Sequence, residues 1–561
     1  MPNFLEKIFD QLERSAGRVV LREIRGEHFV SFTGRELLDQ IQLVRAYLRR
    51  CALQPGDRCA LLGPNSVRWI AVNLALMAEG LIVVPLYSRQ APTELALMLK
   101  DCRPRLLFVS DVALGEGVAR AWPGNAENAP RRVLFEEVLR VPPFPLELAD
   151  APNSRGNTHV ATILYTSGTS GEAKGVCLSI GNLSHMLACT TERLDLLMGQ
   201  LLVTSREPDR VFHYLPFNFA ASWILVLTCL YRETVLTLST DLNRLVSEIQ
   251  LAAPHYFLNV PTLLERVRRG VEEALAKRGT LIRALFARAR DGWHHRHAGR
   301  GRAFDGMWLA LGRSLIFRQV RARFGPHLRA LICGSAPLAP ETQQFFLMLG
   351  ITVLQGYGLT ETTGICTLDD PRLPVEPGYV GSAISGVELK IAENEEIVVR
   401  GPNVFSGYWN RPEETARILE DGWLHTGDQG EVNVHGNWRI IGRLKNLIIL
   451  NSGHNVAPEP IEDKIAQLLP GAQHVVLVGN GRGYLCALVS GALEPAAIQS
   501  VLDNVNLGLP HYRQIRNFRI LPAAFTAENG LLTANGKLRR DAINARYVSE
   551  INAMYDKIQP A

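Results

Sequence analysis

Short runs of Val, Ile and Leu alternate with helix-like stretches over the first 330 residues, and this alternation most constrains the fold. Apolar runs without polar alternation suit strands that are covered on both faces by helices. Helix-like stretches such as 67–78 and 93–100 lie between the runs. The pattern therefore predicts an α/β fold built from αβ-layered sheets. The predicted strands are 58–62, 81–87, 106–110, 161–166, 234–238, 256–260 and 330–333.

The character of the sequence changes near residue 387, where apolar runs become shorter and are separated by Gly and Asn turns. We therefore predict a β-rich subdomain over about 387–443, at the end of a large N-terminal domain, 1–443. A separate strand and helix alternation over 444–561 predicts a small α+β C-terminal domain. A Pro-rich segment, 141–154, is predicted to be an exposed connector inside the large domain.

Composition excludes several classes of protein. With 47% hydrophobic and 20% charged residues in 561, the chain has the apolar content of a globular protein, not of a disordered or collagen-like one. Nine scattered cysteines form no C-x-x-C pair, which argues against a disulfide framework or zinc site and favours a reducing, cytoplasmic setting. A net charge of +5 in so long a chain gives no indication of nucleic-acid binding.

A run of 21 residues between Arg210 and Arg232 carries no formal charge, which is long enough to span a bilayer. Its first half contains His213 and Asn218, whose polar groups would be left in hydrocarbon. We therefore predict a loop that leads into a buried helix. The N-terminus carries charges every few residues, so no signal peptide is predicted.

The strongest local motif is YTSGTSGEAKG, residues 165–175, which directly follows the apolar residues 161–164. Its hydroxyls and glycines can close around an anion, and its lysine adds a compact positive charge. The spacing is not that of a Walker loop. This concentration after a core strand favours a polyphosphate-binding loop over a polar surface turn. The candidate ligands are Thr166, Ser167, Gly168, Thr169, Ser170, Gly171 and Lys174.

This loop resembles the phosphate-binding signature of the adenylate-forming (ANL) superfamily, which contains acyl-CoA synthetases, luciferases and peptide-synthetase adenylation domains. Ser170 stands where threonine is usual and keeps the hydroxyl, whereas Ala173 stands where proline is usual and loosens the turn. Two further segments match in the family's order, CGSAPL at 333–338 and QGYGLTET at 355–362. The resemblance covers nearly the whole chain and implies the ANL fold, whose C-terminal domain is a mobile lid.

The resemblance implies roles for these motifs. The ring of Tyr357 would pack on the nucleotide base, Thr360 would hydrogen-bond the α-phosphate, and Glu361 would hold the Mg²⁺ that screens the phosphates. Thr169 is the second implied metal ligand. The loop at 333–338 would hold adenine. The other implied ATP or AMP contacts are Gly334, Ser335, Ala336, Gln355, Gly356 and Gly358.

Three motifs near the domain boundary and the C-terminus complete the resemblance. Asp428, in WLHTGDQG, would accept both ribose hydroxyls, Arg443 would contact the ribose and phosphates, and Lys445 would be the hinge. Lys537 follows an Asn-Gly turn and is predicted to be catalytic together with Thr360 and Glu361. A cation between the substrate carboxylate and the triphosphate offsets their repulsion as charge develops at phosphorus. Because Lys537 lies on the lid, it can be withdrawn after the first step.

The substrate class is indicated by two segments. NVAPEPIE, at 455–462, resembles long-chain fatty acyl-CoA synthetases more than the peptide-synthetase or acetyl-activating branches. YLPFNFAASW, at 214–223, aligns with the family's acyl-pocket motif, with Phe219 inside it. Trp223 falls where some long-chain enzymes have an aromatic gate, although it could equally be a core residue. An apolar acyl tail is favoured.

Residues 262–330 carry 16 Lys and Arg against five acids. Apolar residues are interleaved with these charges, as in a helix that lies on anionic lipid. The alternative is an ordinary solvated helical hairpin, and the sequence leaves both open. The histidines at 294, 295 and 297 are predicted to belong to a solvated basic loop, because no Cys or carboxylate cluster accompanies them. The interleaved apolar residues are Leu281, Ile282, Leu285, Phe286 and Trp293.

Together these features predict an acid–thiol ligase that forms AMP. A medium- to long-chain fatty acid and MgATP would give acyl-AMP, and CoA would then take the acyl group. Two alternatives stay open: transfer to an acyl carrier protein, and a catalytically silent acyl- or nucleotide-binding protein. The expected location is cytoplasmic, with a peripheral position on the inner face of a membrane as the finer hypothesis.

Overall fold

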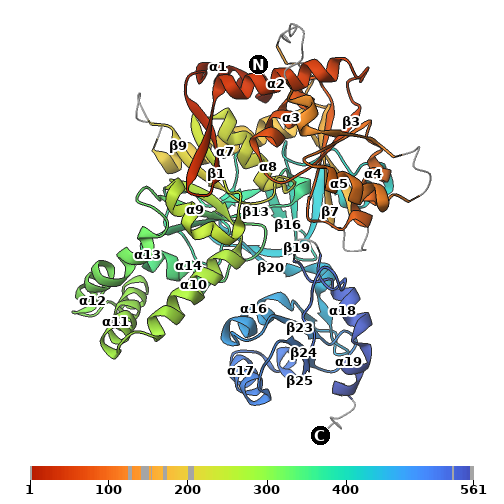
Figure 1. Cartoon of the computed structure of the whole chain (residues 1–561). Helices are drawn as coiled ribbons and strands as arrows, with labels where there is room; N and C mark the ends of the chain where they lie inside the picture. The colour runs from red at the N-terminus through yellow and green to blue at the C-terminus, as the bar shows by residue number, and fades with distance from the viewer. Residues whose placement is uncertain are drawn as a thin grey trace.

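The computed structural model describes residues 3–123, 129–140, 151–152, 155–167, 173–199, 207–533 and 536–555. The predicted connector at 141–154 lies almost wholly outside these ranges. Figure 1 shows a large N-terminal body of sheets and helices and a smaller C-terminal group of elements, drawn in blue, beneath it. The architecture is the predicted α/β fold with mixed sheets and a C-terminal domain.

A six-stranded sheet runs in the order β6-β5-β3-β4-β7-β8. Its neighbours are parallel except for the antiparallel pair β7 and β8. The four strands predicted for this region are confirmed to within two residues at each end, because their apolar runs are buried on both faces. The strands are β3 Arg58–Leu62, β4 Ile82–Leu86, β5 Leu106–Val109, β6 Arg131–Leu134, β7 Val160–Ser167 and β8 Ala173–Ser179; the helices between them include α3 Val67–Ala78, α4 Pro92–Cys102 and α5 Val112–Arg120.

A nine-stranded sheet runs in the order β15-β14-β13-β12-β11-β9-β10-β1-β2. Its central strands are parallel, whereas β2, β14 and β15 are antiparallel to their neighbours. The strands are β1 Val19–Arg25, β2 His28–Thr33, β9 Asp209–His213, β10 Thr234–Leu238, β11 Tyr256–Asn259, β12 Ala330–Cys333, β13 Thr352–Tyr357, β14 Thr367–Leu368 and β15 Ser382–Ala383. Its surrounding helices include α1 Phe4–Arg14, α2 Gly34–Arg49, α7 Ile180–Met198, α9 Leu245–Ala252 and α14 Pro340–Met348.

Two helices, α3 and α8 (Ala220–Tyr231), are buried on nearly all sides and belong to one hydrophobic cluster with strands of both sheets. This confirms the buried helix predicted in the uncharged run before Arg232. The rings of Trp69 and Phe217 lie 5.0 Å apart in the same cluster. Among the described residues, the helices include none with the length and apolar content needed to cross a bilayer.

An antiparallel sheet forms the predicted β-rich subdomain. Trp423–Val432 is one continuous strand, so Asp428 lies within a strand although glycines stand on both sides of it in the sequence. Pairing with strands on both sides overrides the turn propensity of the glycines. The strands are β16 Glu388–Ile391, β17 Glu396–Arg400, β18 Leu419–Glu420, β19 Trp423–Val432 and β20 Trp438–Arg443, with helix α15 at Pro412–Ile418.

The C-terminal elements have hydrophobic clusters of their own, formed by residues from 448 onward. A three-stranded sheet, β23-β24-β25, has helices packed against it, and a hairpin turn at 479–483 joins β23 to β24. The boundary at 443/444 stays a prediction. The elements are β21 Ile448–Ile449, β22 Asn455–Val456, α16 Glu459–Leu468, β23 His474–Val478, β24 Leu485–Ser490, α17 Pro495–Leu507, β25 Ile515–Leu521, α18 Arg540–Arg546 and α19 Val548–Tyr555.

The basic segment folds into helices that form the lower-left edge of the molecule in Figure 1. The prediction of a solvated loop for the three histidines is wrong, because they form the last turn of α11, where His297 stacks on Trp293 at 3.8 Å. All nine cysteines are free, as predicted. The elements of the segment are α10 Pro261–Ala276, α11 Thr280–His297, α12 Asp305–Gly312, a π-helical turn at Arg313–Phe317 and α13 Arg318–Ala322.

We expect Arg232→Met to destabilise the large domain by about 3–5 kcal/mol, because it would leave the fully buried carboxylate of Asp209 without its cation. The guanidinium Nη2 of Arg232 lies 2.7 Å from Asp209 Oδ2, and Nη1 also pairs with Asp195. Urea unfolding of the full chain measures the change. Arg18→Met is the matched control, because the Arg18–Glu233 pair is half exposed and is worth about 0–1 kcal/mol. Equal losses of unfolding free energy in the two variants would contradict a special stabilising role for the buried Arg232–Asp209 pair.

Candidate active site

The loops after β12 and β13 lie side by side at the carboxyl ends of parallel strands, where open α/β sheets bind ligands. A Cβ on Gly334 would lie 3.2 Å from the carbonyl oxygen of Gly356, so the two loops are in contact. Ser335 has φ +72°, a left-handed conformation that is costly for a residue other than glycine. Ser335 and Ala336 are exposed, which leaves this strained loop open to a ligand.

The side chain of Gln355 is not part of this open surface. It is 3% exposed, and its amide Nε2 donates to Gln343 Oε1 at 2.7 Å and to the carbonyl of Tyr379 at 3.1 Å. The side-chain amide of Gln355 is therefore used inside the core, and a contact of this residue with the nucleotide stays a prediction. Packing explains the glycine at position 358, because a Cβ there would lie only 2.5 Å from the Cα of Ile365.

A buried carboxylate, Asp428, joins two of the predicted motifs. Asp428 and Arg443 are register partners on β19 and β20, and Asp428 Oδ1 lies 2.9 Å from Arg443 Nε. The hydroxyl of Tyr357 donates to Asp428 Oδ2 at 2.8 Å. Burial raises the pKa of Asp428, while the positive charge of Arg443 acts in the opposite direction. The sequence assigned Tyr357 to the base, and the structure adds that its hydroxyl holds Asp428.

Glu361 lies in a short 3₁₀ turn, Thr360–Thr362, directly after β13. Its carboxylate Oε1 accepts a hydrogen bond from the hydroxyl of Tyr408 at 2.7 Å. Burial and the nearby charge of Glu361 raise the pKa of Tyr408, so its hydroxyl stays protonated and donates. Sequence reasoning missed Tyr408, because it is 47 residues away and belongs to none of the motifs that we singled out.

Lys174 is positioned by the same tyrosine. Its ammonium lies 5.2 Å from the centre of the Tyr408 ring, a cation–π distance, and pairs with the carboxylate of Glu414. The backbone at 405–409 pairs with β8: Trp409 N donates to Gly175 O at 2.7 Å, and Phe405 N donates to Glu361 O at 2.9 Å. This segment therefore ties the predicted phosphate lysine to the predicted metal carboxylate.

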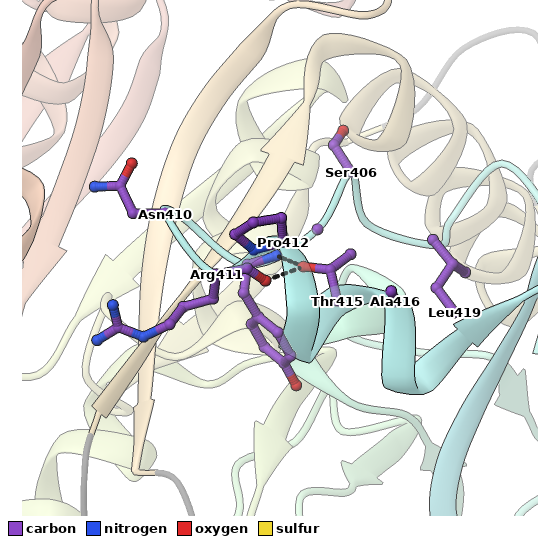
Figure 2. A pocket seen from close by; sticks show the side chains of 9 residues that line it. Ser406, Asn410, Arg411, Pro412, Thr415, Ala416 and Leu419 are labelled. Carbon is purple, nitrogen blue, oxygen red and sulfur yellow. Dashed lines mark hydrogen bonds between the residues drawn. The ribbon is translucent and has the colours of Figure 1, made fainter.

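An open cavity of about 440 Å³ lies beside this segment (Figure 2). Thr415 Oγ1 closes one wall, because it accepts from Tyr408 N at 2.9 Å and donates to Arg411 O at 2.8 Å. No motif predicted this cavity. Its lining residues are Ser406, Gly407, Tyr408, Asn410, Arg411, Pro412, Thr415, Ala416 and Leu419.

The C-terminal domain brings Lys537 to the same group of charges. Burial and the like charge of Arg443 lower the pKa of Lys537, while Asp428 and Glu361 act against this shift. The side chain of Lys537 is still exposed to solvent. Lys445, in the turn directly after β20, has a pKa lowered to about 8 by partial burial and by Arg443. Four predicted residues, Asp428, Arg443, Glu361 and Lys537, therefore lie within electrostatic reach of one another.

Several predicted residues are not brought together by the described structure. Residues 168–171 lie outside the described ranges, as does the side chain of Ser167, whereas Thr166 lies within β7 and is the register partner of Lys174. Trp223 is wholly buried, and its indole Nε1 donates to Asn73 Oδ1 at 3.3 Å, so it packs as a core residue. Phe219 precedes α8, and its ring centre lies 6.2 Å from that of Tyr87.

The candidate metal ligand within the described residues is Glu361. The described residues contain no group of three or more His, Cys, Asp or Glu side chains arranged to hold an ion. Among the described residues, Tyr408 donates to Oε1 of the Glu361 carboxylate, which leaves the other oxygen available to a ligand. Mg²⁺ is commonly held by one or two carboxylates together with substrate phosphates and water, so Glu361 fits such a site.

The fold and this site define an adenylating type of enzyme, and comparison with known proteins agrees. The model of the AMP-binding enzyme family matches residues 8–409, and that of the AMP-binding enzyme C-terminal domain matches residues 445–559. The chain belongs to the AMP-binding enzyme family. This result confirms the resemblance on which the sequence analysis rests.

The individual relatives have low sequence identity to this chain. The chain is 28% identical to the protein named Long-chain-fatty-acid--CoA ligase FadD15 of Mycobacterium tuberculosis, over 99% of this chain and 97% of that protein. It is 27% identical to Long chain acyl-CoA synthetase 3 of Arabidopsis thaliana, over 96% and 89%. Among solved structures, ATP-bound MatB from Rhodopseudomonas palustris has a TM-score of 0.74 at 22% identity, over 97% of this chain and 98% of MatB. At that identity the structural likeness shows the fold alone.

Tyr408→Phe is expected to weaken MgATP binding about 10-fold, because it removes the hydroxyl that orients Glu361 and a hydrogen bond to a charged group is worth about 1.5–3 kcal/mol. Isothermal titration calorimetry on the full chain measures the affinity. Tyr231→Phe is the matched control, since it removes a hydroxyl that accepts from Lys7 at an exposed position. Unchanged MgATP affinity in Tyr408→Phe would show that Glu361 does not depend on this tyrosine.

Proposed function

We propose that this chain uses ATP to activate a medium- to long-chain fatty acid and then transfers the acyl group to CoA. In the first step a carboxylate oxygen attacks the α-phosphorus of ATP, and the bond to pyrophosphate breaks. In the second step the CoA sulfur attacks the acyl carbon, AMP leaves, and the thiol proton passes to solvent. The group formed by Asp428, Arg443, Glu361 and Lys537 supports this proposal, because it offers cations for phosphate oxygens and carboxylates for ribose hydroxyls and a metal.

Asp428 and Arg443 would hold the ribose and phosphate side of the nucleotide. The carboxylate of Asp428 already accepts from Tyr357 and pairs with Arg443. Each carboxylate oxygen can accept two hydrogen bonds, so capacity remains for the ribose hydroxyls. Thr360, next to Glu361, would donate to the α-phosphate, and Thr166 with the neighbouring loop would surround the outer phosphates.

Glu361, together with Thr169, would hold Mg²⁺, which screens the phosphate charges when it is bound. Tyr408 keeps the Glu361 carboxylate in one orientation. Lys174 pairs with Glu414 and would exchange this carboxylate for a phosphate oxygen. The exchange would be electrostatically favourable, because a polyphosphate brings more negative charge to Lys174 than one carboxylate does.

Lys537 would stabilise the transition state of the first step. Its partly desolvated ammonium is a stronger electrostatic partner than one in bulk water. Rotation of the C-terminal domain about Lys445 would then withdraw it and admit CoA. The relatives named as long-chain enzymes above support the substrate class. A gating role for Trp223 would require its buried side chain to leave Asn73.

The acceptor and the cellular setting are finer parts of the proposal. A carrier-protein thiol would react by the same step as CoA, so direct comparison of the two acceptors separates them. A silent binding protein is disfavoured by the group of charged residues around Asp428. The positive segment 262–330 and an amphipathic substrate support work at the surface of an anionic membrane on the cytoplasmic side.

Fatty-acid-dependent ATP–pyrophosphate exchange, measured across chain lengths before CoA is added, tests the first step. We expect exchange with medium or long chains, followed by thioester formation on adding CoA. Lys537→Ala should slow exchange about 100- to 1,000-fold, the usual loss when one group that stabilises transition-state charge is removed. Lys464→Ala removes an exposed lysine elsewhere on the lid and should leave the rate unchanged. Exchange by Lys537→Ala at the parent rate would overturn the mechanism.

The pH dependence of exchange should report Lys537. The lowered pKa means that, as pH rises, Lys537 releases its proton earlier than an ordinary lysine does. The value of kcat/KM for ATP should therefore fall as pH rises through that lowered pKa. Lys537→Arg keeps a guanidinium that stays charged, so the fall should move to higher pH. Lys445 has a pKa of about 8, so Lys445→Arg is the matched control. If the fall in kcat/KM moved to higher pH only in Lys445→Arg, the titrating group would be Lys445 at the hinge and not Lys537.

A further inference from the structure

Four large apolar side chains are exposed in a row on the outermost helices of the basic segment. They are Phe304 at 67%, Met307 at 47%, Leu311 at 39% and Leu315 at 53% exposure. Spacings of three, four and four residues place them on one face of α12 and the π-helical turn that continues it. We call these four residues the apolar ridge.

The opposite face of the same helices is firmly packed. Leu309, Ile316 and Phe317 are buried in one cluster with Ala289 and Trp293 of α11. The contact between the helices is close: a Cβ on Gly312 would lie 2.7 Å from the Cβ of Ala289, and one on Gly292 would lie 3.0 Å from Asp305 O. The hairpin is therefore a firmly packed unit, and the ridge is exposed because its other face already forms the core.

This arrangement changes which residues could meet a partner. The sequence offered five apolar residues of α11, of which Leu281 is exposed, at 84%. The other four pack inward against the hydrophobic cluster; they are Ile282, Leu285, Phe286 and Trp293. Both faces of the hairpin contain apolar residues, so periodicity alone does not show which face is outside. The structure moves the candidate surface from α11 to α12 and the π-helical turn.

Positive charge surrounds the ridge. Arg300 and Arg302 precede Phe304, and Arg313 and Arg318 follow Leu311, all with exposed side chains. The whole segment 262–330 has an excess of 11 positive charges, so the rest of the chain is net negative. Apolar side chains bordered by arginines match the interface of an anionic bilayer, where arginine stems lie along apolar surface and their heads reach the lipid phosphates.

We propose that the apolar ridge docks this protein on anionic lipid, with the four ridge side chains inserted at the headgroup boundary and the flanking arginines on lipid phosphates. The choice of a lipid partner rests on the proposed fatty-acid substrate, whose tail partitions into bilayers. A second copy is a poorer partner, because a symmetric contact would bring two equally positive surfaces together. Figure 1 shows α12 at the outer tip of the hairpin, where a flat surface can reach it.

Co-sedimentation of the full chain with vesicles tests the proposal. Vesicles of phosphatidylcholine alone are compared with vesicles that also contain phosphatidylglycerol, at low and high salt. We expect the parent to bind only the anionic vesicles, and more weakly at high salt. The triple variant Met307→Ser, Leu311→Ser, Leu315→Ser should bind at least ~10-fold more weakly, because it removes the inserted apolar area.

The matched control is the double variant Val434→Ser, Leu507→Ser, which removes apolar side chains exposed at 96% and 88% outside the segment. It should bind as the parent does. Equal vesicle binding by the triple variant and the parent would overturn the proposal, and so would absence of parental binding at low salt. A triple variant that changes only the oligomeric state, measured by light scattering, would assign the ridge to a second copy.

Exchange activity with a soluble, shorter fatty acid and no vesicles separates this inference from the proposed function. The triple variant should retain the parental exchange rate, because the ridge contains none of the residues around Asp428. A parent that binds vesicles through the ridge but activates no fatty acid would refute the proposed function and leave the docking surface standing.

Discussion

The buried carboxylate of Asp428 connects three parts of the molecule. Tyr357 reaches it from the nine-stranded sheet, Arg443 reaches it from the neighbouring strand of the β-rich subdomain, and the charge of Lys537 reaches it from the C-terminal domain. Burying a carboxylate is costly unless it is paired and hydrogen-bonded, so each of these partners offsets part of that cost. The positive charge of Lys537, on the C-terminal domain, thus favours the charged form of this carboxylate.

A second link joins the predicted phosphate loop to the predicted metal carboxylate. Tyr408 donates to Glu361 while its ring faces the ammonium of Lys174, and its own backbone is held by Thr415. Glu414 pairs with Lys174. If Lys174 binds phosphate as we propose, a polyphosphate would have to compete with this carboxylate. The ion pair would then disfavour singly charged anions more than triphosphate.

Sequence reasoning located the parallel strands well because their apolar runs are buried on both faces, and β3, β10 and β12 match to the residue. It also chose Asp428, Arg443 and Lys537, which the structure brings together, from motif order. It missed Tyr408 and Glu414, since their roles depend on backbone pairing between 405–409 and β8. Gln355 was assigned to the nucleotide from its motif, but its hydrogen bonds to Gln343 and Tyr379 depend on tertiary packing that no local pattern reports.

The small net charge of +5 conceals a strong separation of charge. The segment 262–330 has 16 basic and five acidic residues, whereas the rest of the chain has 44 basic and 50 acidic residues. Such a distribution gives the molecule an electrostatic polarity, so an anionic surface attracts the hairpin and repels the remainder. At physiological salt this interaction acts over about 8 Å, which is enough to orient the molecule only near contact. Insertion of the ridge would then supply the short-range attraction that charge alone does not, so the two features together specify one face of the protein.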